Sequence, residues 1–346
     1  MKNFLSFSKD RRKNVCEQAQ DKLGLPPVAI EKDFWVCWTL KKLFNLPEWG
    51  SQLIFKGGTS LSKGWALIDR FSEDIDIVIN RKSLGFGGDN APDCAPSRKQ
   101  TRKRLDALKA ASQQCVTETL LPLLREAVSK EMNAELPWHL DADPDDPDGQ
   151  TPLFAYPTAF ADLMAYVPQV VKIELGARSD TEPTQEIDIQ PYLSGAFPDL
   201  IPQSRFPVRA VSPERTFWEK AMLLHEETFR PPGKKRKARM ARHYYDLYRL
   251  IAAGIGNRAA DDLKLFERIA AHRQVYFRYT WVDYDTLQPG HLKLVPPDDQ
   301  LDVWRSDYLA MKDEMFFEKP PAFEDLMGTV RVFQDAFNQK LEVELS

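Results

Sequence analysis

The stretch that decides the fold runs from residue 56 to residue 79 and reads KGGTSLSKGWALIDRFSEDIDIVI. Its Gly57-Gly58 pair predicts a sharp turn, because glycine adopts backbone conformations that other residues avoid and lets a ligand approach the backbone closely. We expect a helix over Thr59–Leu67 and then a β-branched strand over Phe71–Ile79. The stretch therefore predicts a turn, a helix and a strand in direct succession.

Two carboxylates lie two positions apart on the expected strand. Side chains alternate along a strand, so Asp74 and Asp76 should share one face while Ile75 and Ile77 take the other. Neighbouring carboxylates near a core repel each other unless a cation neutralises them. Because Mg²⁺ binds carboxylates together with substrate phosphates, the pair predicts a magnesium site. A solvated Asp-x-Asp pair on an exposed strand is the alternative.

Thr59 and Ser60 follow the two glycines at the start of the expected helix. Their hydroxyl and backbone N–H groups would form an anion site at a helix N-terminus. A tight turn without function would explain the glycines alone. A possible phosphate site directly before a carboxylate pair instead indicates that a phosphate-bearing substrate and a metal bind together here.

The sequence around this stretch predicts a mixed α/β domain. Leu53–Phe55 is a short apolar run suited to a buried strand directly before the turn. The other elements expected are helices over Ile30–Phe44 and Arg98–Lys130, a loop over Arg81–Ser97, and strands over Val170–Leu175 and Gln185–Ile189. We therefore predict an α/β domain over residues 1–208.

The remaining chain, residues 209–346, is expected to form a mostly helical carboxy-terminal domain. Pro207–Pro213 has the composition of a crossover into this part. The helices expected there span about Glu214–Phe229, Arg239–Ala253, Ala259–Arg273 and Phe323–Leu341.

Charge is spread unevenly along the chain, whose formal net charge is −4. This total argues against a uniformly basic nucleic-acid binder, but an acidic loop, Asp141–Asp148, contrasts with a basic run, Arg230–Arg242. A local basic patch can attract a polyanion whatever the total charge. The basic run predicts either contacts with a tRNA phosphate backbone or a flexible, solvated loop between helices. The residues expected to make the contacts are Lys234, Lys235, Arg236 and Lys237.

The four cysteines, Cys16, Cys37, Cys94 and Cys115, are far apart and show no CxxC pairing. This spacing predicts free thiols in a reducing cytoplasm, without a disulfide framework or a zinc site. The first residues lack the apolar run of a secretory signal, and no later segment has the apolar length of a membrane span. We expect a cytoplasmic protein that does not interact with membranes.

The motifs GGTSLSK and RFSEDIDI resemble the nucleotidyltransferase superfamily with a polymerase-β-like palm. More narrowly, the chain is similar to the AbiEii/AbiGii (MenT-like) toxins of type IV toxin–antitoxin systems. The resemblance covers most of the chain, through EKDFW, FWEKAMLL, RHYYDLYRL and the tail PGHLKLVPPDD…DYLAMKDEMFFEKPPAFEDL. It implies an α/β palm domain, a mixed sheet with helices, followed by a helical carboxy-terminal domain.

The resemblance also implies roles for individual residues. Those expected around the triphosphate are Gly57, Gly58, Thr59, Ser60 and Lys63, and those expected on Mg²⁺, or Mn²⁺ in its place, are Asp74 and Asp76. A third acidic residue on a neighbouring strand is placed at Glu174, with Asp188 as its competitor. Two later motifs place a lysine at Lys220 and an aspartate at Asp246.

The residues themselves allow other interpretations of these positions. Lys220 lies on the apolar stripe of its expected helix, so it is either paired with a carboxylate or held to contact phosphate. Asp246 lies four residues after Arg242, and an ordinary helical ion pair would explain it. Lys172 and Glu174 share a strand face, where a structural ion pair is as reasonable as catalysis.

The reaction that the resemblance implies is attack of an acceptor hydroxyl on the α-phosphorus of an NTP, with release of pyrophosphate. The expected acceptor is the 3′ end of tRNA, and the expected partner is an antitoxin encoded nearby, in a toxin–antitoxin or abortive-infection system that serves phage defence. One alternative is the same chemistry on a protein or on a small molecule such as an antibiotic. Another is a binding protein that kept the palm but lost turnover.

Overall fold

The computed structural model describes residues 1–346 except residues 73, 133–135, 161–168, 312–314, 317–318 and 345–346. The chain forms two compact units: the sheet unit contains Met1–Gly64 and Ser72–Val211, and the helical unit contains Trp65–Phe71 and Ser212–Ser346. The main division lies close to the boundary expected after residue 208. The short segment Trp65–Phe71, however, belongs with the helical unit and not with its sequence neighbours.

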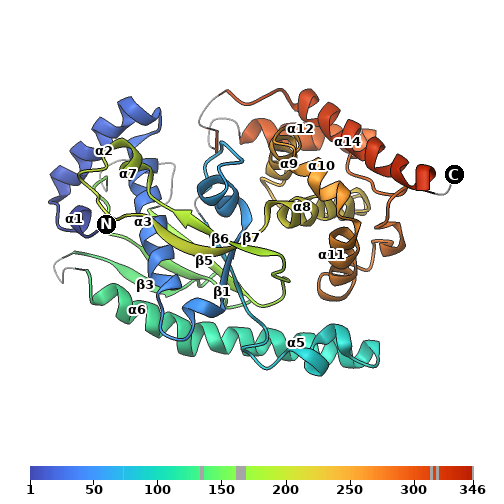
Figure 1. The fold of residues 1–346 in the computed structure, drawn as a ribbon, viewed down its shortest axis with the longest axis horizontal. Coiled ribbons are helices and arrows are strands. Elements are labelled where there is room, and N and C mark those ends of the chain that lie inside the picture. Colours follow the sequence, from blue (N-terminus) through green and yellow to red (C-terminus); the bar gives the residue numbers. More distant parts are fainter. Residues whose placement is uncertain (73, 133–135, 161–168, 312–314, 317–318, 345–346) are drawn as a thin grey trace. The chain divides into compact units, whose positions relative to one another are not determined.

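A mixed seven-stranded sheet forms the centre of the sheet unit, in the order β3-β4-β5-β2-β1-β7-β6 (Figure 1). The strands are β1 (Leu53–Lys56), β2 (Ile75–Ile79), β3 (His139–Ala142), β4 (Pro152–Ala155), β5 (Val170–Gly176), β6 (Thr184–Ile189) and β7 (Phe206–Val211). β2 is parallel to β5 and β1 is parallel to β7, whereas the other neighbours are antiparallel. The α/β class predicted from the sequence is confirmed.

The central strand β2 follows from its sequence pattern. Ile75, Ile77 and Ile79 are fully or almost fully buried, and β-branched side chains of this kind pack well on a pleated surface. The strand begins at Ile75 and not at Phe71, so it is shorter than expected. Asp74 therefore lies directly before the first strand residue, and Asp76 lies within the strand.

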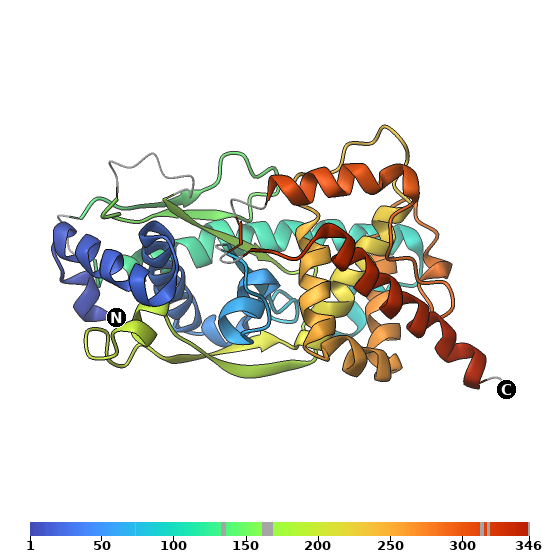
Figure 2. The same ribbon diagram turned by 90° about the horizontal axis from the view of Figure 1, so that it is seen from above.

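Helices and short helical turns complete the sheet unit. They are α1 (Lys2–Leu5), α2 (Lys9–Leu23), α3 (Pro27–Phe44), α4 (Gly57–Thr59), the π-helical turn η2 (Ser60–Gly64), α5 (Arg98–Gln114), the π-helical η5 (Cys115–Leu120), α6 (Leu121–Ser129) and α7 (Tyr192–Ala196). Trp35 and Trp38 of α3 are buried and pack against Phe154 of β4, with ring centroids 6.0 and 5.7 Å apart. In Figures 1 and 2, α3 crosses the sheet and the run from α5 to α6 forms one long helical rod.

The helical unit packs around the first of its helices. Its helices are α8 (Pro213–Thr228), α9 (Arg242–Ala252), α10 (Ile255–Asp261), α11 (Leu263–Tyr276), α12 (Leu301–Ala310) and α14 (Phe323–Glu344). Trp218 of α8 is buried against Phe266 of α11 and Phe337 of α14, with centroid distances of 4.7 and 4.9 Å. Its indole N–H donates to the carbonyl of Ala259 at 3.0 Å, so α8 is tied to α10 as well.

The helix expected over Thr59–Leu67 is instead α4 followed by η2, which ends at Gly64. Two further expected elements also differ from the structure. The expected crossover over Pro207–Pro213 is wrong, because most of it forms β7. Proline is tolerated near the start of a strand, where Pro207 lies. The single helix expected over Ala259–Arg273 is two helices, because the Asp262 side chain accepts a hydrogen bond from the N–H of Leu265 and begins α11 as its N-cap.

The structure also contains elements that the sequence did not predict, among them α7, β3, β4 and α12. The first residues of the expected acidic loop, Asp141 and Ala142, belong to β3. All four cysteines are free thiols. In the part of the chain that the structure describes, no helix combines the length and the apolar character needed to cross a membrane.

Candidate functional site

A row of charged residues crosses three neighbouring strands of the sheet unit. Lys56 of β1 is the register partner of Asp76 of β2, and Asp76 is in turn the partner of Glu174 of β5. Residues that are directly paired across strands point to the same face of a sheet. One cation and two carboxylates therefore share one face at one level. Lys56 was not among the expected site residues, although its place directly before the glycine pair could have indicated it.

The sheet order separates the two candidates for the third acidic residue. Asp188 lies on β6 opposite Pro207, and β1 and β7 stand between β6 and β2. Its carboxylate is 3.8 Å from Arg205, and both side chains are exposed. The structure thus places Glu174, and not Asp188, beside Asp76.

Asp74 is fixed at the start of β2 through its backbone. The Thr59 hydroxyl donates to the Asp74 carbonyl oxygen at 2.6 Å and shares a second hydrogen bond with the Ser72 hydroxyl at 2.8 Å. Lys172, which forms a 3.0 Å ion pair with Glu174, lies within the field of the Asp74 charge. Burial lowers the pKa of Lys172, but the hydrogen bond and charge of Glu174, together with the charge of Asp74, raise it. The structural ion pair considered for Lys172 and Glu174 is thus formed at the edge of the carboxylate group.

The glycine turn fits tightly against the Asp76 carboxylate. Gly57 has a φ of +77°, and a Cβ atom added to it would lie 2.0 Å from Asp76 Oδ2. Gly58 is the second residue of the short helix α4. The Ser60 hydroxyl is buried and donates to the Gly57 carbonyl at 2.9 Å. The hydroxyls of Thr59 and Ser60, which we expected to face a triphosphate, are both used inside the protein to shape the turn.

Lys63 is also turned inward. Its Nζ lies 2.6 Å from Asp33 Oδ1 of α3 and 3.3 Å from the ring centroid of Tyr192 of α7, and both charged side chains are buried. Burial lowers the pKa of Lys63, but the neighbouring Asp33 carboxylate raises it above its usual value, so the ammonium stays charged. The expected contact with a triphosphate is not formed by this geometry, in which Lys63 joins the turn to α3 and α7.

The carboxylates of the sheet unit are candidate ligands for a divalent metal ion. Among the described residues, no three His, Cys, Asp or Glu side chains are grouped closely enough to hold a metal ion by themselves. Mg²⁺ does not require such a cage, because it is usually bound by one or two carboxylates and completes its shell with water and substrate phosphates. The oxygen donors of Asp74 and Asp76, with Glu174 beside them, therefore fit a hard divalent cation that binds together with a phosphate-bearing substrate.

A second cluster of charges lies inside the helical unit and contains Lys220 of α8 and Asp246 of α9. The Lys220 Nζ is 2.8 Å from Asp246 Oδ2. Arg70, from the segment Trp65–Phe71, donates through Nε and Nη2 to the two Asp246 oxygens at 2.7 and 2.8 Å. Asp246 is fully buried and pairs with these two cations, not with Arg242 as in the helical alternative. Arg70 was missed by the sequence analysis, because no local pattern indicates a partner on a distant helix.

In this cluster the cations outnumber the carboxylate. Burial raises the pKa of Asp246, but the cations of Arg70 and Lys220 hold it well below its usual range. Burial lowers the pKa of Lys220, and the Asp246 carboxylate opposes that effect. Burial and the Lys220 cation also lower the pKa of His243, whose Nδ1 is buried without a hydrogen-bond partner. Two cations around one carboxylate and a neutral imidazole form a cluster suited to an anion.

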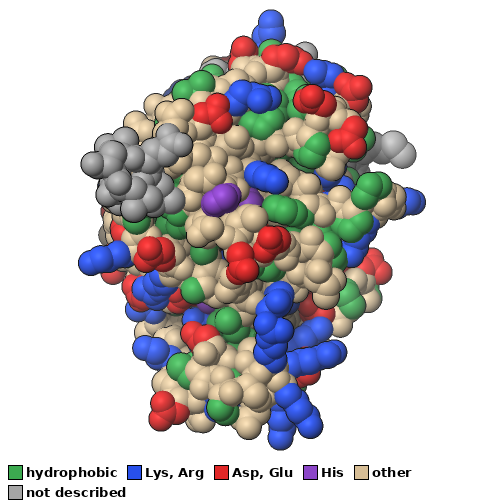
Figure 3. Space-filling model, turned by 90° about the vertical axis from the view of Figure 1, so that its right-hand side faces the viewer, with side chains coloured by type: hydrophobic (Ala, Val, Ile, Leu, Met, Phe, Trp, Pro, Cys, Tyr) green, Lys and Arg blue, Asp and Glu red, His purple; other side chains and the backbone are tan. Residues whose placement is uncertain are grey.

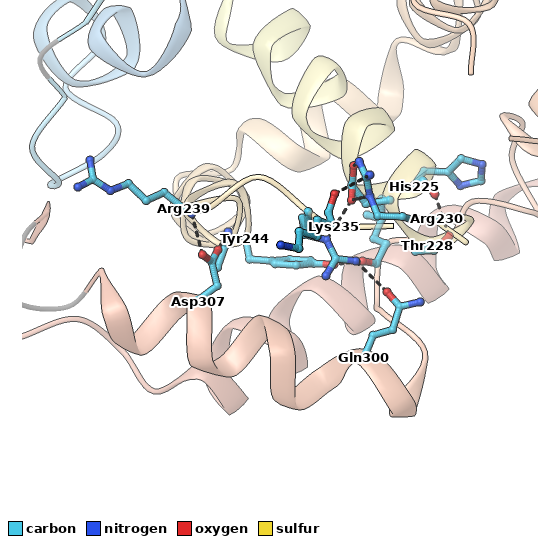
Figure 4. Close-up of polar contacts among 12 residues, drawn as sticks. His225, Thr228, Arg230, Lys235, Arg239, Tyr244, Gln300 and Asp307 are labelled. Atoms are coloured by element: carbon cyan, nitrogen blue, oxygen red, sulfur yellow. Dashed lines mark hydrogen bonds and ion pairs between the residues drawn. The ribbon is translucent and has the colours of Figure 1, made fainter. Parts of the chain in front are cut away.

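The basic loop, residues 230–241, is organised by specific contacts. Arg230 and Arg236 both bind Glu227 of α8, and the Arg236 guanidinium also donates to Gln300 and lies 4.0 Å from the Trp304 ring centroid. Asp307 of α12 accepts from the backbone N–H groups of Arg239 and Ala241 at 2.7 Å each (Figure 4). These contacts anchor the loop to α8 and α12.

The basic loop, residues 299–300 and α12 line an open pocket of about 610 Å³. Arg236 faces inward and organises the loop, whereas Lys234, Lys235 and Lys237 are exposed. Charge is uneven on the surface as well, since Figure 3 shows Lys and Arg side chains gathered at the lower edge of one face and acidic side chains scattered over the rest.

Comparisons with known proteins give one family model that matches most of the chain. The family model described as nucleotidyl transferase AbiEii toxin, type IV TA system, matches residues 38–341. Among solved structures, MenT4, a nucleotidyltransferase toxin from Mycobacterium tuberculosis H37Rv, is 16% identical over 95% of this chain and 89% of that chain, with a TM-score of 0.48. JHP933 from Helicobacter pylori is 16% identical over 95% and 97%, with a TM-score of 0.40. No curated protein sequence matches the chain. Both TM-scores lie below 0.5, so the family match alone decides to which family the chain is assigned.

Proposed function

The chain belongs to the AbiEii family of nucleotidyltransferase toxins of type IV toxin–antitoxin systems, and we propose that it transfers a nucleoside monophosphate from an NTP to the 3′ end of tRNA in a Mg²⁺-dependent reaction. Nucleotidyl transfer, an NTP substrate and an antitoxin partner follow from the family. The metal, the tRNA acceptor and the residues that act are our proposal. So are the cytoplasmic location and the role in phage defence.

The observation that supports the proposal best is the row of Asp76 and Glu174, with Asp74 directly before the strand. When bound, Mg²⁺ would hold the triphosphate and stabilise charge at the reacting phosphorus. Asp74 and Asp76 would supply its carboxylate ligands. The backbone of Gly57 supports Asp76, and the Thr59 hydroxyl fixes Asp74 through its carbonyl.

We assign to Glu174 the role of activating the acceptor hydroxyl. This carboxylate is partly exposed, so it can orient a hydroxyl and take its proton as the oxygen attacks the α-phosphorus and pyrophosphate leaves. Its 3.0 Å ion pair with Lys172 holds the carboxylate on this face of the sheet. In the helical unit, the family resemblance assigns Lys220 to phosphate contact, and Arg70 and Asp246 position its side chain.

The site assignment is tested by Asp76→Asn, with Asp188→Asn as a matched control. Both aspartates lie on strands of the same sheet, but Asp188 lies three strands away from Asp76 in the sheet order. Nucleotidyl transfer by Asp76→Asn should fall by at least about 100-fold, the size of effect seen when a charge-stabilising group is removed. Asp188→Asn should keep wild-type turnover. A folded Asp76→Asn variant with wild-type turnover would show that the site is elsewhere.

The acceptor is tested with purified protein, Mg²⁺, total tRNA and each α-³²P-labelled NTP in turn. Label on tRNA that disappears in Asp76→Asn would support the proposed acceptor and identify the base. Unlabelled tRNA, with label on a protein or small-molecule pool instead, would refute the acceptor while leaving the chemistry intact. Removal of the metal with a chelator should abolish the transfer of label to either kind of acceptor.

A further inference from the structure

A pair of stacked aromatic side chains lies on the surface of the helical unit, directly after α11. The rings of Tyr279 and Trp281 have their centroids 4.5 Å apart and are inclined by 20°. Tyr279 is 40% exposed, which makes it one of the few large apolar side chains with an open face among the described residues. The Lys234 ammonium of the basic loop lies 3.4 Å from the Trp281 ring centroid. An exposed aromatic stack therefore adjoins a cationic segment.

The loop that carries this stack is held by a buried network. The Tyr284 hydroxyl accepts a hydrogen bond from the N–H of Tyr279 at 3.0 Å and donates to Glu226 Oε1 at 3.1 Å. Glu226, on α8, also forms a buried ion pair with Arg273 of α11, whose Nε is 2.8 Å from Oε1. Because these contacts hold the backbone of the loop at Tyr279, less conformational entropy is lost on binding.

The charge beside the stack is of one sign. The basic run over residues 230–242 contains no acidic residue. Arg230 and Arg236 are occupied by Glu227, and Lys234 covers Trp281. Lys235 and Lys237 are exposed on the same loop. The surface thus combines flat apolar rings with available positive charge.

We propose that Tyr279, backed by Trp281, forms a stacking platform for the bases of single-stranded RNA, and that Lys235 and Lys237 bind the flanking phosphates. Bases stack on aromatic side chains whatever their identity, and lysines bind the backbone without reading sequence. The inference rests on the proposed function, because it takes RNA as the acceptor. It goes further by naming the part of the RNA that this surface binds, namely unpaired nucleotides such as those at a tRNA 3′ end. A flat ring pair beside cations suits bases joined by phosphates better than it suits an acidic protein surface.

The platform is tested by equilibrium binding of a short fluorescein-labelled single-stranded RNA, measured by anisotropy without NTP. Tyr279→Ala should weaken affinity roughly tenfold, within the range for loss of one base–aromatic stack. Tyr279→Phe keeps the ring and should bind as the wild type does. Val332→Ala is the matched surface control, because Val332 of α14 is also apolar and 71% exposed. Lys235→Ala should reduce the slope of log affinity against log salt by about one.

The outcomes separate the platform from the proposed function. Wild-type affinity in Tyr279→Ala, or no RNA binding by the wild-type protein, would overturn the platform. Loss of affinity in Tyr279→Ala and not in Tyr279→Phe would support it, even if tRNA proves not to be the acceptor. Asp76→Asn should bind this RNA normally, because binding does not need the carboxylate site. If that variant neither transfers label nor differs in RNA binding, chemistry and RNA binding are distinct properties of the chain.

Discussion

At the carboxylate site, the Asp76 side chain packs so closely against Gly57 that residue 57 has no room for a side chain. The carboxylate occupies the position that a Cβ atom on residue 57 would need, and the positive φ of Gly57 disfavours any side chain there. This contact explains why the turn needs glycine: the backbone must approach the carboxylate closely enough to fix its direction. The buried ion pair between Lys63 and Asp33 holds the other end of the turn.

Gly57→Ala should therefore disable the enzyme by moving Asp76. Gly85→Ala is the matched control, because Gly85 has a similar φ of +85° but nothing within 4 Å of an added Cβ. Both variants should lose about 1 kcal/mol of stability from backbone strain, and only Gly57→Ala should lose most of its nucleotidyl transfer. Thermal unfolding and the labelled-NTP assay measure the two effects. Equal activity in the two variants would show that the Asp76 contact is unimportant.

At the scale of elements, α8, α9 and the segment Trp65–Phe71 meet at Asp246. A single buried carboxylate binds cations from two other parts of the chain, one of them 176 residues away in sequence. Removing one member leaves buried charge without compensation, which costs more than the pair contributes relative to an apolar core. The helical unit thus depends on this carboxylate to hold the short segment that lies between the glycine turn and β2 in the sequence.

Asp246→Asn should destabilise the protein by roughly 3 kcal/mol, because it leaves Arg70 and Lys220 buried without a counter-charge. Asp69→Asn breaks an ion pair with Arg249 whose side chains are 54% and 37% exposed. It should cost less than about 1 kcal/mol, as exposed pairs do. Urea unfolding of both variants gives the comparison. Equal, small losses would mean that the buried cluster is solvated or readily rearranged.

At the scale of the whole molecule, stability against pH is set by buried groups whose pKa changes on folding. His225 of α8 accepts a hydrogen bond at Nδ1 from the N–H of Lys293, and its Nε2 is 3.0 Å from the Thr286 hydroxyl. Burial, followed by the charge of Lys293, lowers the pKa of His225 from 6.5 to about 4. The folded protein therefore keeps this imidazole neutral at a pH where the unfolded chain binds a proton.

The free energy of unfolding should accordingly fall as the pH drops from about 6.5 towards 4. A lowered pKa means that the stabilising contribution is complete above the unfolded value and is lost as the pH falls through the folded one; for His225 it amounts to about 3 kcal/mol. In His225→Asn the free energy of unfolding should depend less on pH. The pKa of His243 is lowered as well, so His243 should account for part of the pH dependence that remains. Urea unfolding at several pH values measures the dependence.

The sequence by itself determined the local elements and the carboxylate pair. Apolar periodicity and glycine placement gave α3, β1, the turn, the core of β2 and α8, because each depends on residues a few positions apart. The sequence also indicated Asp74, Asp76 and, through the family resemblance, Glu174, Lys220 and Asp246. Their catalytic roles stay predictions.

Only the tertiary structure decided which distant side chains meet. It placed Lys56 in a row with Asp76 and Glu174, brought Arg70 to Asp246, and showed that Thr59, Ser60 and Lys63 face inward. It also brought the basic loop to Trp281. Strand order and helix packing set these pairings, and a buried polar group must find its partner wherever the folded chain supplies one. No local pattern encodes that choice, because it depends on the path of the whole chain.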